Sequence, residues 1–109
     1  MAELLQSAVS RISAANYFES AIVIDARRNY DLSIEFDHLI EDAKLVIEPV
    51  TPEQARIARQ AYRYYGRGSG HPANLNFGDC FAYALARDKR EPLLYKGDDF
   101  VHTDIRAAI

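Results

Sequence analysis

Hydrophobic positions recur every three or four residues along several stretches of the chain, which predicts amphipathic helices. These stretches cover residues 13–29, 31–43, 51–65 and 76–86. Each one begins at a polar side chain that can cap a helix, namely Ser13, Asp31, Thr51 and Asn76. At Thr51 the signal is strongest, because Pro follows at the first helical position and Gln stands three residues after the cap.

Short runs rich in β-branched and apolar residues separate these helices and predict strands over residues 9–12, 45–50 and 92–95. Residues 2–8 are predicted to form the C-terminal end of a further helix. Strands that alternate with helices favour an α/β fold of three layers, in which helices flank a parallel sheet on both faces. Parallel sheets usually have more strands than this, which indicates that a strand is missing or is supplied by a partner.

The composition restricts the class of protein. A length of 109 residues suits one domain, and one cysteine allows no internal disulfide. No apolar run is long enough to span a membrane, so we expect a soluble cytoplasmic protein without a membrane partner. The net charge of -3 argues against a non-specific nucleic-acid binder, so any contact with nucleic acid should be local.

Asp79 stands out because it places a carboxylate on the first turn of an otherwise apolar helix, just after Asn76 and Gly78. One interpretation is structural, since first-turn acids complement the helix dipole. The other is catalytic, and it depends on further acids. Glu19 has small or apolar neighbours three and four positions away, which predicts that it points toward the protein, where a buried Glu needs a partner or a metal.

Two more acids follow the predicted strand 92–95. Asp98 and Asp99 lie beyond its carboxyl end, where ligands collect in open α/β sheets, although they could also serve as turn formers or a helix cap. If Glu19, Asp79 and Asp99 converge, with Asp98 beside them, their repulsion requires a divalent cation. An all-oxygen set favours Mg²⁺ or Mn²⁺, and this chemistry is that of a nuclease or a phosphatase.

Other chemistries find less support in the sequence. The histidines and Cys80 are too scattered for a zinc site, and Cys80 reads as a small core residue. The tyrosines near the end of the helix 51–65 are interpreted as packing groups rather than base-stacking platforms. The loop 66–72 is either a flexible connector or a phosphate-holding segment, because it is rich in Gly and Arg but lacks a nucleotide fingerprint.

The chain resembles the VapC-type toxins of bacterial toxin–antitoxin pairs, which are PIN-domain ribonucleases. The resemblance rests on residues 12–19, 50–55, 71–86, 93–100 and 103–105, of which 71–86 is the longest and most specific. It implies Mg²⁺-dependent endonucleolytic cleavage of RNA, in which Glu19, Asp79 and Asp99 match the second, third and fourth acidic positions. It also implies a homodimer and inhibition by a cognate VapB-type antitoxin. Because Arg67 and His71 stand just before the Asp79 helix, we expect them to hold RNA phosphates, and Lys96 is a further candidate.

The chain departs from the family pattern at its start. Members of the family begin with a central strand that ends in an Asp, and Met1 falls after that strand. Residues 1–109 are therefore expected to form a single, N-terminally truncated PIN-like domain without the first acid or the first strand. This motivates an alternative, a catalytically inactive interaction module that dimerises or binds the antitoxin. A phosphorylated receiver domain using Asp98, Asp99 and Lys96 is a third reading, which the order of these residues along the chain disfavours.

Overall fold

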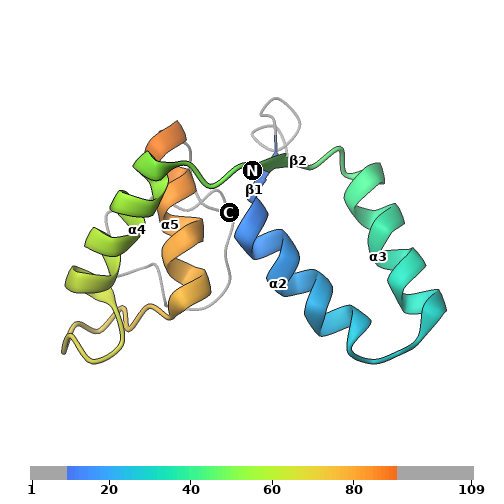
Figure 1. The fold of residues 1–109 in the computed structure, drawn as a ribbon, viewed down its shortest axis with the longest axis horizontal. Coiled ribbons are helices and arrows are strands. Elements are labelled where there is room, and N and C mark those ends of the chain that lie inside the picture. Colours follow the sequence, from blue (N-terminus) through green and yellow to red (C-terminus); the bar gives the residue numbers. More distant parts are fainter. Residues whose placement is uncertain (1–9, 91–109) are drawn as a thin grey trace.

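The computed structural model describes residues 10–90, which form two short parallel strands and four helices (Figure 1). In chain order these elements are β1 (Arg11–Ser13), α2 (Ala14–Asp25), α3 (Tyr30–Asp42), β2 (Val46–Glu48), α4 (Pro52–Tyr65) and α5 (Phe77–Lys89). The α/β class and the parallel pairing agree with the sequence prediction. Outside the described residues lie the predicted helix tail 2–8 and strand 92–95, together with Lys96, Asp98 and Asp99.

The two strands lie between two pairs of helices, α2 with α3 and α4 with α5 (Figure 1). β1 pairs with β2 in parallel, and the register places Arg11 opposite Val46 and Ser13 opposite Glu48. Glu48 accepts a hydrogen bond from Arg11 Nη1, and its Oε2 lies 3.9 Å from Lys89 Nζ. Because its side chain is only 14% exposed, this acid joins both strands to the end of α5 in a partly desolvated ion pair.

Small side chains allow α4 and α5 to pack closely, and the core of the described region lies between them. Its buried members are Ala58, Ala61, Ala73, Leu75, Cys80, Tyr83 and Ala84. Gln54 is also buried, and its Nε2 donates to Asp88 Oδ2 at 3.0 Å, which satisfies a polar group at the helix contact. Within residues 10–90, no helix has the length and apolar character needed to cross a membrane.

Three of the predicted helix caps are confirmed. The side chains of Ser13, Thr51 and Asn76 accept hydrogen bonds from backbone N–H groups in the first turns of α2, α4 and α5. The predicted end of the helix 51–65 is confirmed as well, because α4 runs to Tyr65.

The prediction that Asp31 caps the second helix is wrong. Asn29 is the cap instead, because it has an extended backbone (φ -112°, ψ 108°) and its Oδ1 accepts from Leu32 N. The helix α3 therefore begins at Tyr30, two residues before the start that a cap at Asp31 would give. The preceding helix was predicted to run to residue 29, but it ends at Asp25, because a turn follows and Arg28 adopts a positive φ of 55°. The strands differ as well: β1 (Arg11–Ser13) is shifted toward the C-terminus from the predicted 9–12, and β2 (Val46–Glu48) is shorter than the predicted 45–50.

Candidate functional site

The site begins at the first turn of α5, where a reciprocal cap holds Asp79. Asn76 Oδ1 accepts from Asp79 N at 2.8 Å, and Asp79 Oδ2 accepts from Asn76 N at 3.0 Å. The structural interpretation of Asp79 is therefore correct, since the residue completes a capping box. The catalytic interpretation stays compatible with it, because a carboxylate offers about four lone-pair positions and can serve a cap and a ligand at once.

Glu19 reaches across from α2 to this same turn. A methyl group added at Gly78 would lie 2.5 Å from Glu19 Oε1 and 2.7 Å from Oε2, which means that the carboxylate rests against the bare backbone of Gly78. Gly78 is buried and immediately precedes Asp79. The structure thus brings Glu19 to the α5 turn that carries Asp79. The residue as a whole is exposed, so Glu19 turns toward the protein, as predicted, without being buried.

A side-chain hydrogen bond links the two helices at this point. Asn16 lies one turn before Glu19 on α2, and its Nδ2 donates to the backbone oxygen of Gly78 at 2.8 Å. The other end of the same amide, Asn16 Oδ1, is buried and has no hydrogen-bond partner among residues 10–90. Asn16 is one of the small or apolar neighbours from which Glu19 was predicted to point toward the protein. Its spacing of three residues from Glu19 was the signal that could have identified it.

The donor set suits a hard cation. The carboxylates of Glu19 and Asp79 supply oxygen atoms, and the buried Asn16 Oδ1 is an acceptor to which a water ligand of Mg²⁺ could donate. Residues 10–90 hold no group of three or more His, Cys, Asp or Glu side chains that could complete a metal site by themselves. The acids predicted to complete it, Asp98 and Asp99, lie outside these residues.

Cys80 follows Asp79 but takes no part in the exposed site. It is 5% exposed and belongs to the core, which confirms the prediction of a small core residue. Burial, and to a lesser degree the neighbouring Asp79 carboxylate, raise the pKa of the Cys80 thiol. The thiol therefore stays protonated at neutral pH and is a poor nucleophile.

The loop after α4 places its two predicted RNA-binding residues differently. The Arg67 side chain is exposed, while its backbone N–H donates to Leu75 O at 2.9 Å. His71 is partly buried. Its ring packs edge-on against Tyr65 with centroids 4.8 Å apart, and its Nδ1 accepts from Ala73 N at 3.1 Å. His71 thus shapes the loop, whereas Arg67 presents its charge to solvent.

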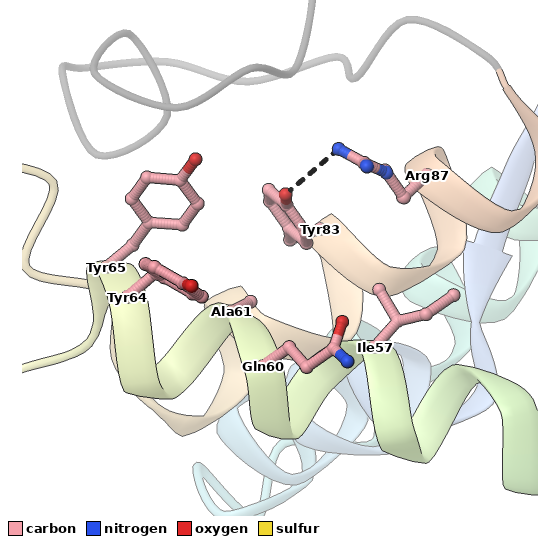
Figure 2. Close-up of a pocket in the computed structure, with 7 residues that line it drawn as sticks. All are labelled: Ile57, Gln60, Ala61, Tyr64, Tyr65, Tyr83 and Arg87. Carbon is pink, nitrogen blue, oxygen red and sulfur yellow. Dashed lines mark hydrogen bonds between the residues drawn. The ribbon is translucent and has the colours of Figure 1, made fainter.

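A cavity of about 370 Å³ lies between α4 and α5, and Glu19 and Asp79 do not line it (Figure 2). Tyr64, Tyr65 and Tyr83 contribute to its wall, and Arg87 Nη1 donates to the Tyr83 hydroxyl at 3.4 Å. Burial raises the pKa of Tyr83, and Arg87 opposes this shift. The Tyr65 and Tyr83 rings lie 5.7 Å apart and pack together, which confirms the predicted packing role for Tyr65, whereas Tyr62 and Tyr64 are 52% and 73% exposed.

Comparison with known proteins extends over nearly the whole chain. The profile of the PIN domain family matches residues 2–106. VapC ribonuclease Mb0625 of Mycobacterium bovis and Ribonuclease VapC28 of Mycobacterium tuberculosis are each 58% identical to the chain over 106 residues, which is 97% of this chain and 80% of the relative. Ribonuclease VapC42 of Mycobacterium tuberculosis is 52% identical over 105 residues, covering 96% of this chain and 80% of the relative.

Proposed function

Because this chain belongs to the PIN-domain family, as a relative of the VapC ribonucleases, we propose that it is an endoribonuclease toxin that cleaves RNA phosphodiester bonds with a carboxylate-bound Mg²⁺ or Mn²⁺. The observation that carries this proposal is the contact of the Glu19 carboxylate with Gly78, beside Asp79. Two acids from helices far apart in sequence are thereby directed to one place. A divalent cation bound between them would offset the repulsion of the two carboxylates.

In this proposal Glu19 and Asp79 hold the cation together with Asp99, and Asp98 is the adjacent candidate. When bound, the cation lowers the pKa of a water molecule and stabilises charge on the phosphate. The chain's own part is to fix the ligands. The Asn76 cap orients the Asp79 carboxylate, and the backbone of Gly78 supports that of Glu19. Asp79 then needs little reorganisation when the substrate binds.

RNA is proposed to reach the site past the loop after α4. Arg67 is exposed there and can contact a phosphate, and Lys96 is expected to add a second positive charge. His71 is retained as a candidate phosphate contact, although its packing on Tyr65 suggests that it acts mainly by shaping the loop. As partners we propose a second copy of the chain and a VapB-type antitoxin, and as location the cytoplasm.

Incubation with structured RNA and Mg²⁺ tests the proposal. We expect endonucleolytic products from the wild-type chain, and a loss of at least 100-fold in the rate for Asp79→Asn and Glu19→Gln, comparable to other losses of single catalytic groups. Removing divalent cations with a chelator should abolish cleavage. Equal cleavage by wild type and Asp79→Asn would exclude Asp79 from the mechanism. No cleavage together with antitoxin binding would identify an inactive interaction module instead.

A further inference from the structure

Asn16 makes the one described side-chain hydrogen bond between α2 and α5, and it does so beside the proposed acids. We propose that Asn16 is a positioning residue, which holds the first turn of α5 against α2 so that the Glu19 carboxylate stays beside Asp79. This inference rests on the proposed function, because it concerns the same pair of acids. It assigns to Asn16 no contact with substrate or with the reacting atoms.

The placement of Asn16 on α2 supports this role. Residues three apart on a helix share a face, so Asn16 and Glu19 both project toward α5. The two side chains meet the same residue from there: Asn16 Nδ2 donates to Gly78 O at 2.8 Å, and both Glu19 carboxylate oxygens occupy the space that a Cβ at Gly78 would fill. Fixing the carbonyl of Gly78 therefore fixes the surface on which the Glu19 carboxylate lies.

Glu19 itself is poorly suited to fix this contact. Glu19 is exposed, and a long exposed side chain keeps its rotamer freedom unless its surroundings restrict it. Asn16, by contrast, is partly buried, and Gly78 is its only described side-chain partner, since Asn16 Oδ1 accepts from no group within residues 10–90. The substitution Asn16→Ala would remove the hydrogen bond to Gly78 O while leaving Glu19 itself unchanged.

The first measurement needs no metal. In the wild-type chain we expect NOE contacts between the Glu19 side-chain CH₂ protons and the Gly78 Hα protons. Asn16→Ala should lose them. Asn29→Ala is the matched control. The Asn29 side chain also stabilises the fold, as the cap of α3, but it lies away from Gly78. The control should keep the contacts. Their persistence in Asn16→Ala would overturn the inference.

The second measurement is the affinity for Mn²⁺ by titration calorimetry. Supporting residues around a metal site typically contribute 10- to 100-fold in affinity, so Asn16→Ala should weaken Mn²⁺ binding by roughly tenfold or more, and Asn29→Ala should not. In a Glu19→Gln background the Asn16→Ala change should have no further effect, because a positioning residue acts through the group it positions. An equal loss in both backgrounds would show that Asn16 has a general structural role, against the inference.

The two measurements also separate this inference from the proposed function. If the wild-type chain binds no Mn²⁺, the proposed metal centre fails, while the NOE contacts still decide whether Asn16 positions Glu19. If the wild-type chain binds Mn²⁺, and Glu19→Gln and Asp79→Asn weaken binding but Asn16→Ala does not, the metal centre stands and Asn16 has no part in it.

Discussion

At the scale of single residues, two glycines show how the same missing side chain can serve different purposes. A Cβ at Gly66 would collide with the backbone oxygen and the ring of Tyr62, which belong to the last turn of α4. The three atoms nearest to a Cβ at Gly78 all belong to the carboxylate of Glu19, at the end of an exposed side chain. Gly66 is therefore needed for the fold, and Gly78 for the placement of an acid.

We expect Gly78→Ala to reduce RNA cleavage by about tenfold or more, since displacing a catalytic group by an ångström is costly. The free energy of unfolding should change by less than about 1 kcal/mol, because Ala favours a helix over Gly by a similar amount and Glu19 can move aside. Urea unfolding and cleavage assays on the same preparation measure both effects. Gly66→Ala is the control, and it should lose about 1–3 kcal/mol of stability, as overpacked sites do. Equal destabilisation by both variants would contradict this assignment.

Cys80 gives a prediction about alkaline pH. Its pKa is raised in the folded protein above the ordinary value of 9.0, mainly by burial and further by Asp79, so the unfolded chain loses the thiol proton first as the pH rises. The stability contribution is therefore fully present below that ordinary value and is lost as the pH rises through the folded pKa.

Unfolding experiments in urea at several pH values above about 8 measure this loss. The free energy of unfolding of the wild-type chain should fall as the pH rises, and it should fall less steeply in Cys80→Ala. Tyr83, whose pKa is also raised, should add to the fall at higher pH, so Tyr83→Phe provides an independent comparison. Identical slopes in wild type and Cys80→Ala would show that Cys80 is not responsible.

At the scale of elements, the first turn of α5 combines a cap and a proposed ligand in Asp79, and variants can separate these roles. Asn76→Ala removes the cap acceptor and should cost about 1 kcal/mol of stability. Asp79→Asn keeps an oxygen that can still accept from Asn76 N, so it should cost less stability than Asn76→Ala but much more activity. Thermal unfolding and cleavage rates test this. Loss of activity in strict proportion to stability would support the purely structural interpretation of Asp79.

Local chemistry explains which elements could be predicted from the sequence. Thr51 and Pro52 fix the start of α4 within a few residues, because cap and proline act on their own neighbours. The start of α3 could not be chosen in the same way, since Asn29 and Asp31 are both good caps and the turn through Arg28 decides between them. A positive φ at an arginine cannot be predicted from the pattern of residues.

The candidate site was predictable only in part, for a related reason. Asp79 follows a helix start and Glu19 interrupts an apolar neighbourhood, so both could be selected from local patterns. The contact of Asn16 with Gly78 joins residues 62 positions apart and depends on how α2 packs on α5. Hydrophobic periodicity states which face of a helix is covered, but not which residue of another helix it meets.

At the scale of the molecule, charge limits how RNA can bind. A chain with a net charge of -3 gains little from non-specific attraction, so individual cations near the site matter more. We expect Arg67→Ala to weaken RNA binding and to lower the slope of log affinity against log salt by about 1, the value for one lost phosphate contact. Arg27→Ala, which removes an exposed cation from the turn after α2, is the control and should leave the slope unchanged. Fluorescence anisotropy at several salt concentrations measures both.

The arrangement of the two helix pairs has a consequence for stability. Glu19 belongs to the pair α2 and α3, and Asp79 to the pair α4 and α5, which meet at the short sheet and at the α2–α5 contact (Figure 1). A cation bound by both acids would hold the two pairs together in the folded state only. Binding of that kind adds RT ln(1 + [L]/Kd) to stability, or about 2.7 kcal/mol at 100 times Kd.

Mn²⁺ should therefore raise the melting temperature of the wild-type chain in a concentration-dependent manner. Glu19→Gln and Asp79→Asn should each reduce this rise, whereas Asn29→Ala should lower the starting temperature and keep the rise. A rise that survives in both acid variants would place the cation elsewhere.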